Sequence, residues 1–318
     1  MGQCYITRRG TKTSGTTEQL GVYPTGEDGR PTGDVTVLDN VITLSEYLFK
    51  NNGNITTVTL PNNLQTISDY SFQSCTQLTS VNIPSNCTSI GDYAFNNCVS
   101  LTNVTLGEKS NYSLGDYAFS NCSTLTNNSV HDIMEHCSTV STNVFRECNG
   151  LTNVEVSRFW TDMFCSCINL ITAKSLIGKD TGNNVFYGCT KLKEVYIADG
   201  TTNIGKIVFY NCTSLKTVYL PSSIITNYFD SLTSTSKSYY VFYNCTALED
   251  VQLGQDWNMS LRLNVSNNLT VNSMVAMFNS LKDLTGETAK TLTLGETNLA
   301  KLTDEQKAIA INKNWTLA

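Results

Sequence analysis

The sequence of 318 residues predicts an α/β solenoid with a parallel β-sheet along one face, short helical or 3-10 turns elsewhere and a helical C-terminal cap. The main observation is a Phe-x-x-Cys signature whose successive Phe spacings are 23, 24, 26, 19, 22, 23 and 33 residues. Self-similarity at such a period is typical of solenoids. The eight signatures are Phe72/Cys75, Phe95/Cys98, Phe119/Cys122, Phe145/Cys148, Phe164/Cys167, Phe186/Cys189, Phe209/Cys212 and Phe242/Cys245.

An apolar pattern, L-x-x-V-x-L/I, follows each signature and predicts one strand per repeat. Leu101, Val104 and Leu106 are an example, and the last two lie two residues apart, which is the side-chain period of a strand. Val, Ile and Thr, which favour strands, dominate these segments. A first copy with Asn in place of Cys begins at Phe49, 23 residues before Phe72.

A second block precedes each Phe, and residues 90–95 (Ile-Gly-Asp-Tyr-Ala-Phe) are an example. We interpret its Ser or Asp as the cap of a short helical turn, with Ala and Phe pointing inward. One repeat cannot bury its own Leu, Val and Phe, whereas stacked repeats can, so the stability of the array is a sum of nearest-neighbour interfaces.

The twelve cysteines predict a ladder of reduced thiols rather than a disulfide framework. Nine of them, including Cys137, occupy one recurrent place in the repeat and should stack in the interior. A buried thiol behaves as a small hydrophobic group whose weak S–H can point at a backbone carbonyl. Asn52, at the same place in the first repeat, can donate in the same way. Cys4, Cys87 and Cys165 lie outside the ladder.

Three segments depart from the pattern. Residues 123–150 contain a near-repeat, Met134-x-x-Cys137, with a degraded strand pattern at 125–130, and the next repeat has Ala173 and Ser175 at apolar positions. We expect a bend or irregular packing there. The last spacing leaves an expanded loop within 221–241, which is a further candidate for function. Its aromatic residues are Tyr228, Phe229, Tyr239 and Tyr240.

These repeats resemble the bacterial leucine-rich repeats of the BspA-like class, whose pattern is roughly I-x-x-x-A-F-x-x-C-x-x-L-x-x-I-x-I-P. Residues 90–106 and 204–221 fit this pattern closely, and the resemblance covers about residues 40–254. It implies a leucine-rich-repeat solenoid with the parallel sheet on its concave face. It also implies host-protein binding and adhesion, at an extracellular or cell-surface location. No signal peptide is visible in residues 1–20.

The predicted organisation is an extended N-terminal segment at 1–40, the solenoid at 41–254 and a capping segment at 255–318. Thr270 can cap a helix that runs to about Leu284, residues 291–295 resemble one more solenoid strand, and Thr303 and Gln306 form a capping box. Residues 288–318 resemble a C-terminal module of repeat proteins from gut Firmicutes and their prophages.

Composition and motifs restrict the function. The net charge is −6 and the sequence has no Lys/Arg run, which argues against nucleic acid as a partner. The sequence also has no run of 18 apolar residues, so we do not expect membrane insertion. Neither a Gly-x-Ser-x-Gly motif, a phosphate-binding Gly-rich loop nor a His-Glu-x-x-His motif is present, so we expect neither an enzyme nor a cofactor. His131, Glu135, His136 and Cys137 suggest a metal site, but we favour surface polar residues of an irregular repeat.

Residues that point outward on the strand side are the candidate binding surface. In the first half they are small and polar, whereas the second half adds Tyr196 and Tyr219 beside acids. Exposed aromatic residues beside acids and amides are typical of recognition surfaces, although Tyr is also simply a good strand residue. We therefore predict a non-catalytic binding or adhesion scaffold for a protein or glycan partner. The alternative is a structural component of a phage or prophage particle. The predicted partner-binding residues are Glu155, Lys174, Glu194, Tyr196, Thr217, Tyr219, Asp250 and Gln252.

Overall fold

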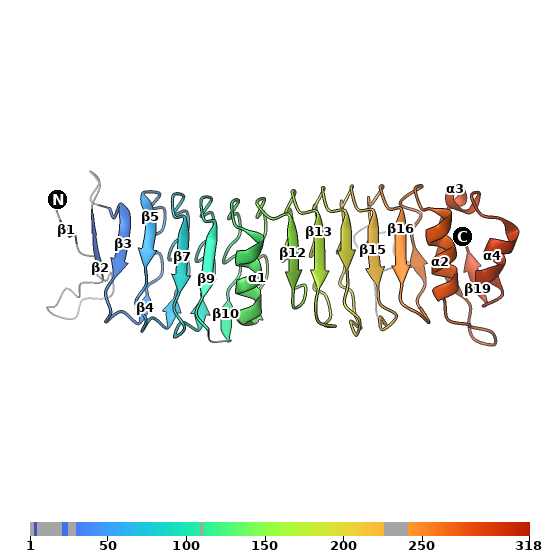
Figure 1. Ribbon diagram of the computed structural model, residues 1–318, viewed down its shortest axis with the longest axis horizontal. Helices are drawn as coiled ribbons and strands as arrows, with labels where there is room; N and C mark the ends of the chain where they lie inside the picture. The colour runs from blue at the N-terminus through green and yellow to red at the C-terminus, as the bar shows by residue number, and fades with distance from the viewer. Residues whose placement is uncertain (1–2, 5–20, 25–29, 109–110, 226–240) are drawn as a thin grey trace. The chain divides into compact units, whose positions relative to one another are not determined.

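The computed structural model describes residues 3–4, 21–24, 30–108, 111–225 and 241–318. The chain forms two compact units, Met1–Leu151 and Thr152–Ala318, and each has its own sheets (Figure 1). The aromatic residues of the expanded loop, named above, lie outside the described residues.

Unit 1 contains two sheets of stacked strands. The first has the order β1-β2-β3-β5-β7-β9, and β3, β5, β7 and β9 are parallel, whereas β1 and β2 pair antiparallel. The predicted strands after each signature are the core of this sheet, and β3 extends it ahead of the first Phe. The bounds are β1 Gln3–Cys4, β2 Gly21–Pro24, β3 Gly33–Val37, β5 Ile55–Thr59, β7 Ser80–Ile83 and β9 Asn103–Leu106.

The second sheet of unit 1 consists of short parallel strands in the order β11-β10-β8-β6-β4, which the sequence pattern did not predict. Turns follow them instead of the predicted helical turn. Asp92 does not cap its own turn but accepts a hydrogen bond at Oδ1 from the Asp116 amide of the next repeat, at 2.7 Å. The bounds are β4 Thr43–Leu44, β6 Thr66–Ile67, β8 Ser89–Ile90, β10 Tyr112–Leu114 and β11 Cys137–Val140.

A helix, α1 (Asn127–His136), closes the first sheet of unit 1, where we expected an irregular strand at 125–130. Its N-cap is Thr126, and Ser129 is buried and accepts a hydrogen bond from the Val104 amide of β9 at 3.1 Å. Cys137 begins β11 and is only half-buried, so its assignment to the thiol ladder was wrong. The helix thus covers the edge strand β9 and provides an acceptor for one of its amides.

Unit 2 contains a sheet of five parallel strands, β12-β13-β14-β15-β16, as the repeats predict. A second sheet, β17-β18-β19, follows with three helices. Helix α2 begins after Thr270 as predicted and ends at Ser280, and the predicted capping box of Thr303 and Gln306 starts α4. The bounds are β12 Asn153–Val156, β13 Thr172–Ser175, β14 Glu194–Tyr196, β15 Thr217–Leu220, β16 Asp250–Leu253, β17 Leu261–Arg262, α2 Val271–Ser280, β18 Lys290–Thr293, α3 Glu296–Leu299, α4 Asp304–Ile311 and β19 Trp315–Leu317.

A ladder of Phe rings and a ladder of Cys thiols lie in the core of each unit, as the signature predicts. The Phe rings stack on one another, and Phe95 lies 5.0 Å from Phe72 and 5.2 Å from Phe119, measured between ring centroids. Seven of the ladder thiols donate to the carbonyl oxygen of the Phe one repeat earlier, at 3.0–3.2 Å. This holds for Cys75, Cys98, Cys122 and Cys148 in unit 1 and for Cys189, Cys212 and Cys245 in unit 2.

These seven thiols are unbridged and buried, which confirms the reduced ladder for them. Burial raises the pKa of the Cys75 and Cys148 thiols to about 12, because a thiolate loses its hydration there. Asn52 takes the same role in the first repeat, where its Nδ2 donates to the Pro31 carbonyl at 3.0 Å. Within each unit the ladder is therefore a line of side-chain donors that joins successive repeats.

Candidate functional site

All eight predicted binding residues lie on one surface of unit 2, the exposed side of β12–β16, which we call the strand face. The strand register places them in two rows. One row consists of Glu155, Lys174, Tyr196, Tyr219 and Gln252, and the other of Glu194, Thr217 and Asp250.

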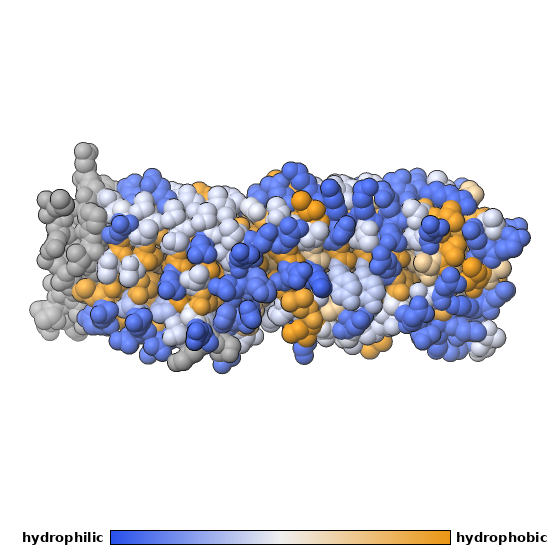
Figure 2. Space-filling view, in the orientation of Figure 1, coloured by the Kyte–Doolittle hydropathy of each residue, from blue (hydrophilic) through white to orange (hydrophobic). Residues whose placement is uncertain are grey.

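Strand alternation explains why these side chains face outward. Val195 and Val218, which lie between the two rows, are 3% and 0% exposed and pack into the core. Their neighbours in sequence therefore point to the other side of the sheet. Hydrophilic and intermediate residues dominate the visible face over β12–β16 (Figure 2). The sheet thus presents the two rows on a rigid support.

Tyr196 and Tyr219 are the centre of the strand face. Their rings stack with 4.6 Å between centroids and 7° between planes, and Lys174 Nζ lies 5.8 Å from the Tyr196 centroid. Stacking on adjacent parallel strands restricts both side chains, so little further rotamer entropy is lost when a ligand binds them. The stack therefore forms a preorganised aromatic platform with an ammonium group at one end.

Asp199, which sequence reasoning missed, fixes the second ring. The Tyr219 hydroxyl donates to Asp199 Oδ1 at 2.7 Å. Partial burial and then this carboxylate raise the pKa of Tyr219, and burial and the charge of Asp199 raise the pKa of Tyr196. Both rings therefore stay neutral at physiological pH. The turn that contains Asp199 ends at Gly200, whose φ of +88° is a position that favours glycine.

Acidic groups outnumber basic ones around the platform. Glu155 and Glu194 are exposed, Asp250 is half-buried, and Lys174 is the cation within the two rows. Asp250 accepts a hydrogen bond at Oδ2 from Gln252 Nε2 at 2.7 Å, which orients both side chains. The surface therefore combines an apolar centre with hydrogen-bonding and negatively charged surroundings, and it disfavours strongly acidic ligands.

The predicted histidine cluster lies on α1 and at the start of β11. His131 and Glu135 share one side of α1, as a helix requires, and His131 Nε2 lies 3.8 Å from Glu135 Oε2 on the exposed surface. In the part of the chain that the structure describes, no three His, Cys, Asp or Glu side chains are placed to hold a metal ion. Among the same residues, no helix has the length and apolar character needed to cross a membrane.

A groove of about 630 Å³ in unit 1 is lined mainly by amides and hydroxyls. Asn63 Nδ2 donates to the Asp39 carbonyl at 3.4 Å, and Asn86 Nδ2 donates to the Asn62 carbonyl at 2.8 Å. These amides join successive repeats, so we assign the groove to the fold. Its lining residues are Asp39, Asn40, Ile42, Asn63, Gln65, Asn86 and Thr88.

Comparison with protein families identifies the repeats. Six copies of the BspA type leucine rich repeat region match residues 42–171, 125–234 and 164–267, which together cover more than half of the chain. The chain belongs to this family. It is therefore an α/β leucine-rich-repeat solenoid of the BspA type, as the sequence predicted. Such a fold is a repeat scaffold, and the family is typically non-catalytic.

Several solved bacterial proteins are similar to this BspA-type chain. A leucine-rich repeat protein from Bacteroides ovatus matches with 19% identity and a TM-score of 0.48, over 99% of this chain and 98% of that one. The pneumococcal vaccine antigen PcpA matches with 16% identity and a TM-score of 0.43, over 93% and 82%. A leucine rich cell surface protein from Faecalibacterium prausnitzii matches with 18% identity and a TM-score of 0.32, over 76% and 95%. No curated protein matches the sequence. Neither the fold nor the family match favours the alternative of a phage component.

Proposed function

We propose that the strand face binds a protein segment or a glycan and that the protein acts as a non-catalytic binding or adhesion scaffold. The observation that carries this proposal is the Tyr196–Tyr219 stack, at 4.6 Å between centroids, on the exposed side of a rigid parallel sheet. Tyrosine offers a large amphipathic surface at a low cost in conformational entropy, and it is enriched among the residues that dominate binding energies.

The surroundings of the stack support recognition rather than chemistry. Lys174 and Glu194 provide charges of both signs, and Thr217 and Gln252 provide hydrogen-bonding groups in the same two rows. A peptide backbone or a sugar ring can stack on the tyrosines and form hydrogen bonds with these groups. Histidine, the commonest general base, is absent from the strand face.

A glycan and host-protein array, followed by calorimetry on any ligand found, tests the proposal. Tyr196→Ala and Tyr219→Ala should each weaken binding about 30-fold, or about 2 kcal/mol. Tyr187→Ala is the matched control, because Tyr187 also stacks on a tyrosine, Tyr210 at 5.0 Å, but outside the strand face. It should leave the affinity unchanged.

Two outcomes would contradict the proposal. A ligand that ignores both strand-face substitutions but is lost when residues 227–240 are deleted would place the site in the expanded loop. A ligand that mass spectrometry finds chemically altered after incubation with the protein would exclude a non-catalytic scaffold.

A further inference from the structure

A second tyrosine array lies in unit 1, on the turns that follow the short strands β4, β6, β8 and β10. Tyr47, Tyr70, Tyr93 and Tyr117 stack face to face, with successive centroid distances of 4.9, 5.0 and 4.8 Å and interplanar angles of 10°, 4° and 7°. All four have a left-handed backbone, with φ between 55° and 60°. We call these residues the turn tyrosines. Their rings are partly exposed, so they are not part of the buried Phe ladder.

A carboxylate precedes each turn tyrosine: Glu46, Asp69, Asp92 and Asp116. Asp69 Oδ1 accepts from the Asp92 amide at 2.8 Å, and Asp116 Oδ1 accepts from the Thr142 amide at 2.8 Å, so these carboxylates are held in place. Partial burial, the neighbouring ring and the nearby carboxylates raise the pKa of Tyr93. A line of negative charge therefore runs beside the neutral rings.

Lys50 shows which chemical group this arrangement attracts. Its Nζ lies 4.8 Å from the centroid of Tyr47 and 4.8 Å from that of Tyr70, beside the first step of the stack. A cation near aromatic rings gains about 0.5–2 kcal/mol, depending on how far it is desolvated. The chain thus places its own ammonium group at one end of the stack.

The last step of the stack lacks such a cation. The repeat position of Lys50 is occupied by Asn96 beside Tyr93, and Asn96 Nδ2 is directed to the Ser120 carbonyl at 3.2 Å. Arg146, the next basic residue at this repeat position, contacts Glu147 through Nε at 3.1 Å. No cation–aromatic contact like that of Lys50 is found for Tyr93 or Tyr117 among the described residues.

We propose that the Tyr93–Tyr117 step, beside Asp92 and Asp116, binds a Lys or Arg side chain of a basic peptide in the way that Lys50 occupies the Tyr47–Tyr70 step. The four carboxylates add attraction for a peptide with several positive charges at the repeat spacing. This site is separate from the strand face of unit 2 and does not depend on it.

The test uses a fluorescent (Gly-Lys)4 peptide, titrated with the full chain at low ionic strength and followed by anisotropy. The same peptide with acetylated lysines is the control for charge. Tyr93→Leu and Tyr117→Leu should each weaken binding about 2- to 30-fold, because the net charge is unchanged and only the ring is lost. Tyr93→Phe and Tyr117→Phe should keep the affinity, and Tyr187→Leu should have no effect.

Lys50→Met sharpens the test, because it vacates the first step of the stack. This variant should bind the peptide more tightly or with about twice the stoichiometry. Circular dichroism melting verifies that each variant is folded, and Lys50→Met still decides between the outcomes if a Leu variant is not. Equal binding by the wild type, the Leu variants and Lys50→Met would overturn the proposal, and so would equal binding of the acetylated peptide.

Discussion

The strand face of unit 2 and the exposed side of β5, β7 and β9 in unit 1 share a backbone pattern but differ in the chemistry of their side chains. In β5, β7 and β9 of unit 1 the outward residues are small and polar, whereas β14 and β15 of unit 2 present Tyr196 and Tyr219. The buried positions do not differ in this way, since both sheets bury valine, for example Val81 and Val218. The fold therefore restricts the inward residues and leaves the outward ones free to vary. The outward residues in unit 1 are Thr57, Thr59, Ser80, Asn82, Asn103 and Thr105.

The edges of the two sheets, by contrast, are closed in the same way. Helix α1 is capped by Thr126, and its Ser129 accepts a hydrogen bond from an amide of β9. Helix α2 is capped by Thr270, and Ser273 accepts from the Val251 amide of β16 at 2.9 Å. A Thr-x-Asn-Ser sequence starts both helices. The outward side chains thus differ between the two units, while the device that closes an open sheet is retained.

The largest effect is expected from a chain that ends at Gly254, which leaves β16 open while α1 still closes β9. Unit 2 should lose its folded state, a change of more than about 5 kcal/mol, and the protein should aggregate. Unit 1 should keep its melting transition. A monomeric product with an unchanged melting profile would show that residues 255–318 are not a cap.

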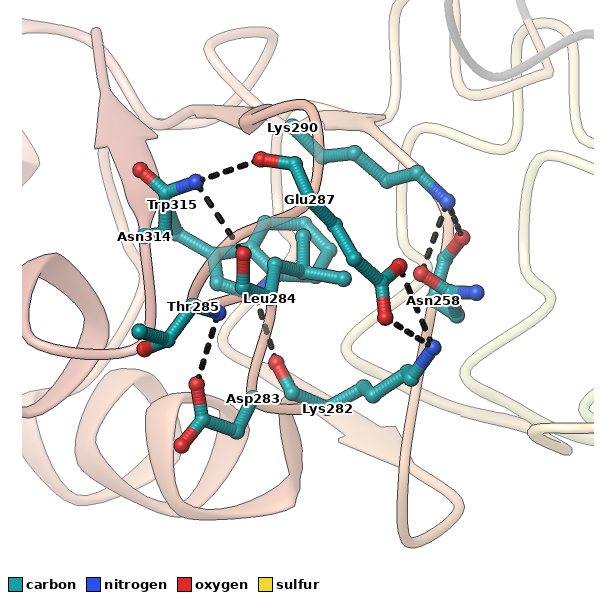
Figure 3. A network of polar contacts seen from close by, with 9 residues as sticks. All are labelled: Asn258, Lys282, Asp283, Leu284, Thr285, Glu287, Lys290, Asn314 and Trp315. Atoms are coloured by element: carbon teal, nitrogen blue, oxygen red, sulfur yellow. Dashed lines mark hydrogen bonds and ion pairs between the residues drawn. The ribbon is translucent and has the colours of Figure 1, made fainter.

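Several hydrogen bonds hold residues 255–318 together, so removing this segment removes a connected network and not a single contact (Figure 3). Lys290 Nζ donates to Asn258 Oδ1 at 2.7 Å, Trp315 Nε1 donates to the Lys282 carbonyl at 2.9 Å, and Asn314 Nδ2 donates to the Glu287 carbonyl at 2.8 Å. These bonds connect β18 to the segment before β17, and they connect β19 and the residue before it to the segment before β18. A cooperative loss is therefore expected.

The thiol ladder should make both units less stable in alkali. Burial raises the pKa of the Cys75 thiol in unit 1 from its ordinary value of 9.0 to about 12, and it also raises the pKa of Cys212 in unit 2. As the pH rises, the thiols ionise in the unfolded chain before they ionise in the folded one. The stabilisation of the folded state by the protonated thiols is therefore complete below about pH 9 and is lost as the pH rises toward 12. The free energy of unfolding should fall by about 1.4 kcal/mol per pH unit for each such thiol.

Urea unfolding at pH 8 to 11 measures this slope, with Cys98→Ala as the matched variant, since it removes one thiol.

Thiol titration of the native protein should find few reactive groups, and nearly all twelve after denaturation. Recovery of fewer than half without a reductant would mean that disulfides hold the array.

A smaller effect is expected at the two closing helices. Ser129→Ala and Ser273→Ala each leave a buried strand amide, that of Val104 or Val251, without its acceptor. Each should cost about 1–3 kcal/mol, as measured by chemical unfolding. The comparison predicts similar costs in the two units. A large cost at Ser273 and none at Ser129 would mean that α1 is only an insertion and does not close the sheet.

The repeated parts of the fold could be predicted from the sequence because the same residue types recur at the same place. Phe95 and Cys98, for example, belong to ladders in which the same residue types recur from repeat to repeat. The outward position of all eight strand-face residues follows from strand alternation. The short strands, such as β8, were missed because two residues carry no period. Helix α1 was missed because Leu125 and Val130 resemble a weakened strand pattern, although Thr126 offered the same capping signal that Thr270 gave for α2.

The unpredicted parts of the candidate sites depend on contacts between repeats. Asp199 reaches Tyr219 from a turn 20 residues earlier, and sequence spacing alone does not show this. The turn tyrosines were seen only as part of a turn motif, because their stacking depends on left-handed backbone conformations. Tyr93 and Tyr117, 24 residues apart, become neighbours only when the repeats are stacked.

We expect recognition to reside on the strand face of unit 2 and not on the exposed side of β5, β7 and β9 in unit 1. Hydrogen–deuterium exchange with and without the array-derived partner tests it most directly, because both sheets are measured in one experiment. We expect slower exchange at residues 194–199 and 217–219 on binding, with no change at 80–82 and 103–105. Protection confined to the unit 1 strands, or absent from both sheets while the partner remains bound, would contradict it.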